Sequence, residues 1–242
     1  YLQKYLDVTK SQMFFAKGII FVEGISEAIL LPEIAKILDR PLEKYAVELV
    51  NVDSVAFSPF VNLFSSQNVQ TCFSKVAIVT DDDRCTKKSE TNYINKDFDY
   101  DDVNSDISGK LLSGTPSERC NELETSCRAV GINVFKATKT LEYALCCDEN
   151  NIEYFIEAIK SEYSQLGPAL EQKVNSLHDM NEKAACVWLF IRAREKCKGA
   201  IAQYISQIIK KQCEMRKRGE NIEKEFVIPD YLKEAVYCVT ER

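Results

Sequence analysis

Short apolar runs alternate with stretches of helical spacing along the first half of the chain. Residues 19–22 form a continuous apolar run. After a Glu-Gly pair, residues 26–38 place apolar side chains on one helix face, with Ser26 as the expected N-cap. Residues 47–52 and 57–64 repeat this order. The pattern predicts strands and helices in alternation.

A third and a fourth apolar run extend the pattern. Residues 75–80 contain Val-Ala-Ile-Val, which indicates a strand buried on both faces, and residues 132–137 predict a fourth strand after a helical stretch over residues 118–130. Between them, residues 84–117 are rich in Asp, Asn, Ser and Lys, and we expect a long loop or insertion there. The order predicts an α/β fold with a mostly parallel sheet flanked by helices.

Beyond residue 150 the chain changes character. Residues 151–218 have helical spacing, and residues 226–228 are the one further strand that we expect. We therefore predict an α/β domain over residues 18–150 and a helical domain over residues 151–242. Residues 1–17 carry no start signal or helix cap and are expected to be a connector from a preceding domain.

The composition is that of a soluble, mildly acidic globular protein. The 242 residues include 31 Lys and Arg against 37 Asp and Glu, a net charge of −6. No apolar run approaches the roughly 18 residues of a membrane span and no secretory signal is visible, so we expect a cytoplasmic protein. Ten cysteines without a Cys-x-x-Cys pair indicate reduced, buried thiols. The single histidine, His178, nearly excludes histidine-based metal binding and Ser-His-Asp catalysis.

Carboxylates follow three of the four predicted strands. Glu23 comes after the first strand, Asp81 and Asp83 after the third, and Glu142 shortly after the fourth. The carboxyl ends of parallel strands lie at one edge of a sheet, so these side chains can converge. Their oxygen atoms suit Mg²⁺ or Mn²⁺ and not zinc. In an extended Asp-x-Asp the first and third side chains point the same way, which favours Asp81 and Asp83 over Asp82 as joint ligands.

Each of these carboxylates also has an ordinary structural interpretation. A carboxylate just after a strand is commonly a loop residue or a helix cap. Glu27, four residues after Glu23, is either a ligand of a second metal ion or a favourable charge at a helix N-terminus. The residues alone leave both interpretations open.

Four motifs surround these residues. They are residues 14–32 around Glu23, Val79-Thr80-Asp81-Asp82-Asp83, Lys139-Thr140-Leu141-Glu142-Tyr143, and Lys198-Gly199-Ala200-Ile201-Ala202-Gln203. In this order they resemble the C-terminal half of the overcoming-lysogenization-defect (OLD) family of ATP-dependent nucleases, which carries a Toprim domain. The chain has no Gly-x-x-x-x-Gly-Lys-Ser/Thr phosphate loop, so the family's N-terminal ABC-type ATPase is absent from it. The resemblance implies that ATPase as a partner in the full-length protein, with homo-oligomerisation.

The resemblance also implies a two-metal phosphodiesterase that nicks and cleaves DNA. Glu23 and Asp81, helped by Asp83, would bind one Mg²⁺ or Mn²⁺ ion, and Glu27 and Glu142 would serve the second. Two such ions can activate a water molecule and stabilise the leaving oxygen. The sequence leaves open the preferred metal and the pathway, which is DNA repair or phage defence.

By the same resemblance, Thr140 assists through its hydroxyl and Lys198 neutralises charge that develops at the phosphate. Residues 192–218 around this lysine hold nine basic against two acidic side chains. The basic residues are Arg192, Arg194, Lys196, Lys198, Lys210, Lys211, Arg216, Lys217 and Arg218. This segment is either a DNA-binding surface without sequence preference or an ordinary solvated helix face.

Two other functions compete with the metal-dependent DNA nuclease. One is a catalytically silent Toprim module for DNA binding or assembly, although retained carboxylates that repel one another argue against it. The other is a phosphatase with Asp81 as nucleophile. That class expects Thr or Val two residues after its Asp-x-Asp, where this chain has Cys85, and it leaves Glu23 unexplained.

Overall fold

The structure is a computed structural model that describes residues 10–64, 75–88 and 92–241. These residues form two compact units, each assembled from separate parts of the sequence. The first unit contains the described residues up to 81, residues 118–137 and those from 230 onward, and the second contains residues 82–117 and 138–229. The chain thus leaves the first unit after the third strand and again after the fourth.

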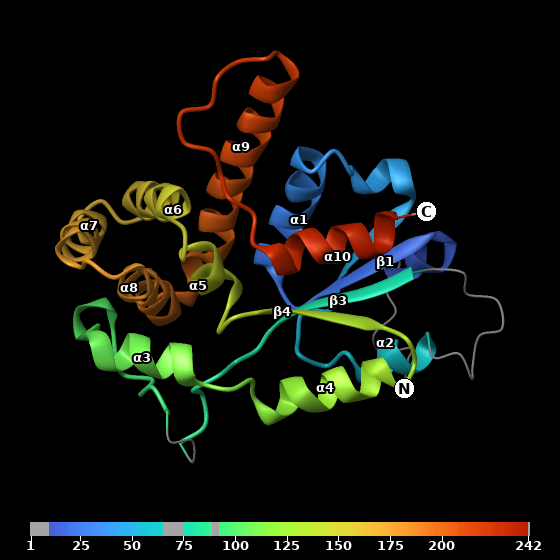
Figure 1. Ribbon diagram of the computed structural model, residues 1–242, viewed down its shortest axis with the longest axis horizontal. Helices are drawn as coiled ribbons and strands as arrows, with labels where there is room; N and C mark the ends of the chain where they lie inside the picture. Colours follow the sequence, from blue (N-terminus) through green and yellow to red (C-terminus); the bar gives the residue numbers. More distant parts are fainter. Residues whose placement is uncertain (1–9, 65–74, 89–91, 242) are drawn as a thin grey trace. The chain divides into compact units, whose positions relative to one another are not determined.

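A four-stranded parallel sheet is the centre of the first unit. Its strands are β1 (Gly18–Val22), β2 (Val47–Asn51), β3 (Lys75–Asp81) and β4 (Asn133–Ala137), in the spatial order β2-β1-β3-β4 (Figure 1). Val22 stands opposite Asn51 and Val79, and Asp81 stands opposite Ala137. The predicted α/β class with a mostly parallel sheet is confirmed, and all four strands end along one edge.

Helices cover both faces of this sheet. α1 (Ile25–Ile37) and α10 (Asp230–Thr240) lie on one face, and α2 (Ser58–Leu63) and α4 (Glu118–Arg128) lie on the other (Figure 1). Two 3₁₀ turns, η2 (Lys10–Phe15) and η3 (Leu42–Tyr45), contact β2. The sheet is therefore buried on both sides, as the continuous apolar run in β3 predicted.

Successive residues of β1 point to opposite faces of the sheet and so contact the helices on both sides. Ile19 and Phe21 belong to a core cluster with α2 and α4, in which the rings of Phe21 and Phe60 lie 5.0 Å apart. Gly18 serves the opposite face, because a Cβ atom there would lie 3.0 Å from the carbonyl oxygen of Val239 in α10. The glycine lets α10 pack directly against the strand.

Two local predictions are wrong. Ser26 does not cap α1: Gly24 holds the N-cap position without a side-chain hydrogen bond, and Ser26 is buried in the first turn. Residues 226–228 form no strand, and α10 begins two residues after them. Gly131 ends the α4 segment as expected, with φ at 78°.

The second unit is helical. Its helices are α3 (Ser105–Ser113), α5 (Leu141–Leu145), α6 (Glu149–Glu162), α7 (Leu166–Ser176), α8 (Met180–Ala193) and α9 (Lys198–Lys217), with 3₁₀ turns η4 (Tyr100–Asp102) and η5 (Glu195–Cys197). α8 contacts α3, α5, α6 and α7, and its residues 184–191 are all buried. A helix that is apolar all round in this way is the core of the unit.

The predicted insertion is more ordered than its composition suggests. It contains η4 and α3, and the side chain of Asn104 caps α3 by accepting the Ile107 N–H. It is held by charged residues far away in the sequence. The two Nη atoms of Arg194 donate to the two carboxylate oxygens of Asp99 at 2.9 and 2.8 Å. Such anchors leave no periodic pattern, which is why the sequence predicted a loop.

No helix within residues 10–64, 75–88 and 92–241 is long and apolar enough to cross a membrane. The cysteines in these ranges are free thiols. Burial raises the pKa of the Cys127 and Cys186 thiols to about 12, so both stay protonated and unreactive near neutral pH. Seven of the nine described cysteines are buried, as expected, whereas Cys147 is exposed and Cys238 is half-buried.

Candidate functional site

The predicted site residues are divided between the two units. The first unit contains Glu23, Glu27 and Asp81, and the second contains Asp83, Thr140, Glu142 and Lys198. Asp81 and Asp83 stand on either side of the point at which the chain passes from the first unit to the second. Thr140 and Glu142 follow the next such passage, after Ala137.

Glu23 follows β1 directly and is held by two neighbours in the first unit. Its Oε2 accepts a hydrogen bond of 2.6 Å from the Thr80 hydroxyl, and the guanidinium of Arg119 lies 3.8 Å away. Arg119 also donates to the carbonyl oxygen of Asp81 at 3.4 Å. The sequence reasoning gave no role to Thr80 or Arg119. Thr80 stood in a quoted motif, whereas nothing in the sequence marks Arg119.

Glu27 lies in the first turn of α1 and is 7% exposed. Its carboxylate folds back toward the end of β1, because a Cβ atom on Gly24 would lie 3.4 Å from Glu27 Oε2. A carboxylate there is favourable beside the N-terminal N–H groups of a helix. The position thus fits both interpretations that the sequence left open, a helix-terminus charge and a metal ligand.

The segment Asp81–Asp83 is not extended, which corrects the argument from alternation. Asp81 is the last residue of β3, but Asp83 has φ at 50°, in the left-handed region. The Asp83 N–H donates to the carbonyl oxygen of Lys139 at 3.3 Å. The backbone therefore turns between the two acids, and strand alternation cannot say where their side chains point.

Asp82 anchors the loop that leaves β3. Its carboxylate, 4% exposed, accepts two-pronged hydrogen bonds from the Arg84 side chain and a further bond of 2.9 Å from the Lys139 N–H. Arg84 also donates to the carbonyl oxygen of Leu111 in α3. Asp82 thus joins the loop after β3, the segment after β4 and the insertion.

Glu142 and Lys198, drawn from two separate motifs, lie together in the second unit. The Lys198 ammonium is 3.6 Å from Glu142 Oε1, and the Glu142 side chain is 8% exposed. Lys198 is the first residue of α9, and Glu142 lies in the first turn of α5. Thr140 is the N-cap of α5, where its hydroxyl oxygen accepts the Tyr143 N–H.

The predicted ligands match divalent metal ions in donor type but are not assembled into a cluster. Within the described ranges, no three His, Cys, Asp or Glu side chains stand close enough together to hold a metal ion. Glu23 and Glu142 each lie beside a basic side chain, Arg119 and Lys198. The carboxylates fit Mg²⁺ or Mn²⁺ through their hard oxygen atoms, and these two basic side chains supply part of the positive charge that such an ion would bring.

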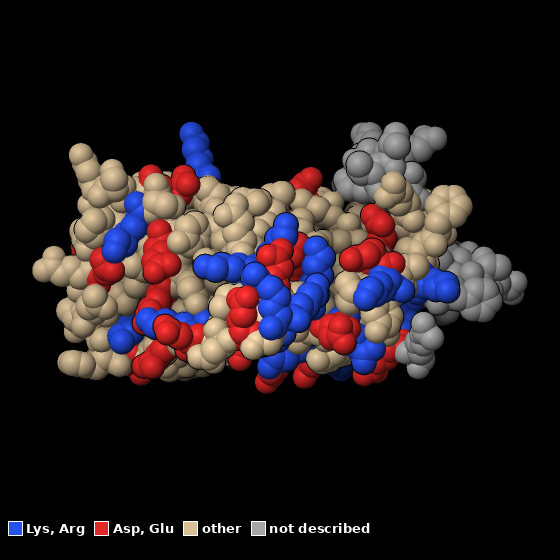
Figure 2. All heavy atoms as spheres, turned by 90° about the horizontal axis from the view of Figure 1, so that it is seen from above, with Lys and Arg blue, Asp and Glu red and all other residues tan. Residues whose placement is uncertain are grey.

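The basic segment is partly committed to the fold. Arg192 donates to insertion carbonyl oxygens, and the other arginines form ion pairs, namely Arg194 with Asp99, Arg216 with Glu225 and Arg218 with Glu220. The four exposed lysines Lys196, Lys210, Lys211 and Lys217 make no ion pair with a described residue. On the face seen in Figure 2, basic and acidic side chains are interspersed. These lysines are therefore the basic side chains of the segment that are least committed to the fold.

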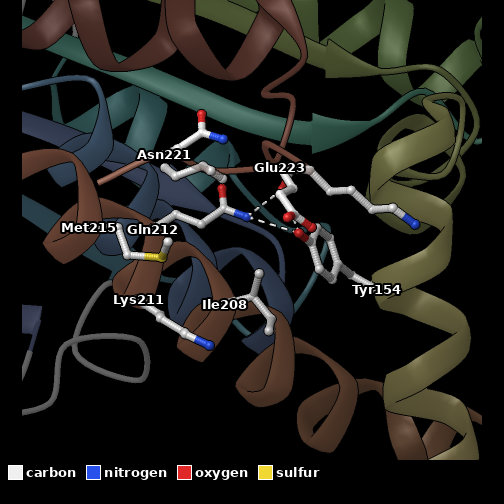
Figure 3. Close-up of a pocket in the computed structure, with 9 residues that line it drawn as sticks. Tyr154, Ile208, Lys211, Gln212, Met215, Asn221 and Glu223 are labelled. Carbon is white, nitrogen blue, oxygen red and sulfur yellow. Dashed lines mark hydrogen bonds between the residues drawn. The ribbon is translucent and has the colours of Figure 1, made fainter. Parts of the chain in front are cut away.

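A cavity of about 400 Å³ lies beside α9 (Figure 3). Gln212 ties the segment after α9 to α6, because its Nε2 donates to the Tyr154 hydroxyl at 3.1 Å and to the Lys224 carbonyl oxygen at 2.9 Å. Its Oε1 accepts the Phe226 N–H. The described residues that line this cavity include none of the predicted metal ligands.

Comparison with known proteins supports the expected resemblance. Residues 14–83 match the family model "Overcoming lysogenization defect protein-like, TOPRIM domain". No curated protein matches the chain. The matched segment contains Glu23, Glu27, Asp81 and Asp83, and it confirms an OLD-like Toprim region in this part of the chain.

Solved structures extend the likeness to almost the full length. The C-terminal region of the Xanthomonas campestris pv. campestris OLD protein is 20% identical, with a TM-score of 0.56 and 95% of each chain covered. The C-terminal region of the Burkholderia pseudomallei OLD protein is 22% identical, with a TM-score of 0.53, covering 93% of this chain and 98% of that one. At these identities the likeness shows the fold.

Proposed function

We propose that this chain, with an OLD-like Toprim domain over residues 14–83, is the catalytic region of a metal-dependent DNA endonuclease. The observation that carries the proposal is the approach of Lys198 to Glu142, at 3.6 Å. These residues were assigned to one reaction from motifs far apart in the sequence. Their proximity supports a shared site and not two unrelated surface positions.

The metal ligands in this proposal are those that the resemblance implied. Glu23 and Asp81, with help from Asp83, would hold one Mg²⁺ or Mn²⁺ ion, and Glu27 and Glu142 would hold the second. Two ions held there would supply the means to activate a water molecule and to stabilise the scissile phosphate and the leaving oxygen.

The remaining roles belong to neighbouring side chains. Thr80, 1% exposed, orients Glu23 through a hydroxyl-to-carboxylate hydrogen bond, and Arg119 restrains the same carboxylate. Lys198 places a compact positive charge where the phosphate becomes more negative in the transition state. Thr140 fixes the start of α5 and thereby the position of Glu142, besides assisting through its hydroxyl.

The substrate in this proposal is DNA bound through its backbone. Exposed lysines of α9 neutralise phosphates, and no base-reading motif is present, so sequence preference is not expected. The full-length protein carries an ABC-type ATPase before this region, assembles as a homo-oligomer and works in the cytoplasm, in DNA repair or phage defence.

The decisive experiment is cleavage of supercoiled plasmid by the purified chain. We expect nicking and linearisation with Mg²⁺ or Mn²⁺ and none with a chelator. Glu23→Gln should remove cleavage, whereas Glu122→Gln, an exposed acid of α4, should retain it. Cleavage that survives the chelator would contradict the two-metal proposal.

A silent Toprim module for DNA binding or assembly is the second candidate. It is favoured by Arg119 beside Glu23 and Lys198 beside Glu142, because these contacts offset part of the carboxylate charge without metal. Under this alternative the chain binds DNA by gel shift but leaves the plasmid intact with every metal. Glu23→Gln would then change neither result.

A further inference from the structure

A second cavity in the second unit, of about 300 Å³, is built largely by the insertion that has no place in the metal site. The insertion contributes Thr86 and Lys96, the segment after β4 contributes Lys139, and α8 contributes Trp188 and Arg192. Three of these five side chains are cationic, and none of the described residues that line the cavity is acidic. Its wall is therefore strongly positive.

Lys139 is fixed at the cavity by its surroundings. The residue is 4% exposed, and its ammonium donates to the Arg84 carbonyl oxygen at 2.6 Å and to the Thr86 hydroxyl at 3.1 Å. Its backbone has φ at 64°, which is unfavourable for a lysine, and is held by the N–H bond to Asp82. Burying an ammonium group and holding a lysine at positive φ both cost free energy of folding, which suggests that the charge has a role.

Trp188 brings the cations together. The Lys139 ammonium lies 5.1 Å and the Arg192 guanidinium 4.8 Å from the centre of its ring. Both distances fall within the range of cation–π attraction, which helps to hold two like charges at one place. The indole itself is 3% exposed, so it forms a wall of the cavity and not a stacking platform.

Arg192 retains donors for a ligand. Its Nη2 group donates hydrogen bonds to the carbonyl oxygens of Asn95 and Phe98. The Nε–H and Nη1–H groups of Arg192 have no hydrogen-bond acceptor among the described residues. A planar guanidinium in this state is suited to an oxyanion that accepts two parallel bonds.

Three acids stand near the cavity without lining it: Asp82 and Asp99 are bound by arginines, and Asp97 is exposed to solvent and attracts Arg192. Asp99 is bound in two-pronged fashion by Arg194, and Asp82 in the same manner by Arg84. Neither carboxylate lines the cavity. The described lining of the cavity thus carries three cationic side chains and no carboxylate.

We propose that this cavity is a binding site for a terminal phosphate, the phosphomonoester at the end of a DNA strand or on a free nucleotide. A phosphomonoester carries about −1.5 to −2 charges and three acceptor oxygens near neutral pH, which matches the three cations of the lining. A phosphodiester within a strand has one charge and a chain on both sides, and it suits a partly enclosed cavity less well. The proposal does not depend on cleavage, because Lys96 and Arg192 have no part in the proposed reaction.

The chain supplies its own probe, since Trp188 is its single tryptophan and lines the cavity. The experiment is a titration followed by tryptophan fluorescence and by calorimetry, with chelator present and about 0.15 M salt. The ligands are inorganic phosphate, a deoxynucleoside monophosphate, and one oligonucleotide with a 5′-phosphate, a 3′-phosphate or hydroxyls at both ends. About 0.15 M salt screens charges more than about 8 Å away.

The variant is Lys96→Glu, an exposed cation of the cavity, and its matched control is Lys88→Glu, an exposed lysine of the same insertion outside the cavity. We expect an end-phosphorylated oligonucleotide to bind at least about 10-fold more tightly than the hydroxyl form. Lys96→Glu should abolish that difference and Lys88→Glu should preserve it. Equal affinity of the oligonucleotide and the free monophosphate would assign the site to free nucleotides.

Two results would overturn the proposal. One is equal calorimetric affinity for phosphorylated and hydroxyl-ended oligonucleotides together with no binding of the monophosphate or inorganic phosphate. The other is a preference for phosphate that Lys96→Glu leaves unchanged. Both outcomes are independent of nuclease activity, because no metal is present in the titration.

Discussion

The Lys198 ammonium lies 3.6 Å from the Glu142 carboxylate, although α5 and α9 are far apart in the sequence. The carboxylate is almost fully buried, so the lysine supplies part of the positive charge that it needs in the absence of metal. A divalent ion bound by Glu142 must share the carboxylate with this lysine or displace it. Under the proposed function, we therefore expect metal binding and the position of Lys198 to be coupled.

Lys198→Ala should separate chemistry from binding. In the proposed reaction its charge acts mainly in the transition state, so single-turnover cleavage at saturating DNA should fall by about 100-fold or more with little change in DNA affinity. Lys210→Ala, an exposed lysine of the same helix, should leave the rate at saturation unchanged. Weaker DNA binding by Lys198→Ala at a normal rate would reduce Lys198 to a residue that only binds phosphate.

The exposed lysines of α9 should govern DNA affinity. Replacing Lys210, Lys211 and Lys217 by alanine should weaken binding and lower the slope of log K against log salt by about 1 for each phosphate that is no longer neutralised. Replacing Arg216 and Arg218 should matter less, because both already form ion pairs. The measurement is a DNA titration at several salt concentrations, and an unchanged slope would exclude α9 from the DNA interface.

Asp82→Ala should be strongly destabilising. The sequence alone favours Asp81 and Asp83 as metal ligands and assigns no role to Asp82. The substitution leaves the Arg84 guanidinium, 14% exposed, without its carboxylate and removes the acceptor of the Lys139 N–H. Breaking a buried ion pair in this way costs about 3–5 kcal/mol. Urea denaturation measures the change in the free energy of unfolding, and Asp97→Ala, an exposed acid of the insertion, should cost under about 1 kcal/mol.

The contact between Lys136 and Glu124 should make the free energy of unfolding depend on pH in the acidic range. The Lys136 ammonium hydrogen-bonds to Glu124 at 2.5 Å and holds the pKa of that carboxyl below its ordinary value. A pKa lowered by folding adds stability above the unfolded value of about 4.3, and this is lost as pH falls through the folded pKa.

Glu124→Gln should therefore lose up to about 1 kcal/mol near neutral pH and less in acid, since the pair is partly exposed. Denaturation curves at several pH values test this difference. Glu122→Gln, on the same helix without such a partner in the described structure, should follow the wild-type curve.

The sequence predicted the central sheet well because two of its strands, β1 and β3, are continuous apolar runs. β1 and β3 are buried on both faces, so hydrophobicity alone marks them. α3 was missed because charged side chains distant in the sequence anchor the insertion around it. Ser26 was assigned as a cap from residue type, but the tight turn after Glu23 places Gly24 at that position.

For the site, the sequence could name residue types but not their partners. Motif spacing pointed to Glu142 and Lys198, and the structure places them together. Arg119 lies in a helix without a motif, so only tertiary structure brings it to Glu23. The roles of Glu23, Glu27, Asp81, Asp83, Thr140, Glu142 and Lys198 stay predictions until the variants are measured.

The close approach of Gly18 to Val239 affects the order in which the protein can mature on the ribosome. β1 is synthesised early, but its cover, α10, emerges only after the whole second unit. The helical unit can therefore complete its core during synthesis, while the part of the sheet face that α10 covers beside α1 stays open until residues 230–240 arrive. The sheet depends on packing between segments of long sequence separation, which slows folding and leaves apolar surface open to aggregation in the interval.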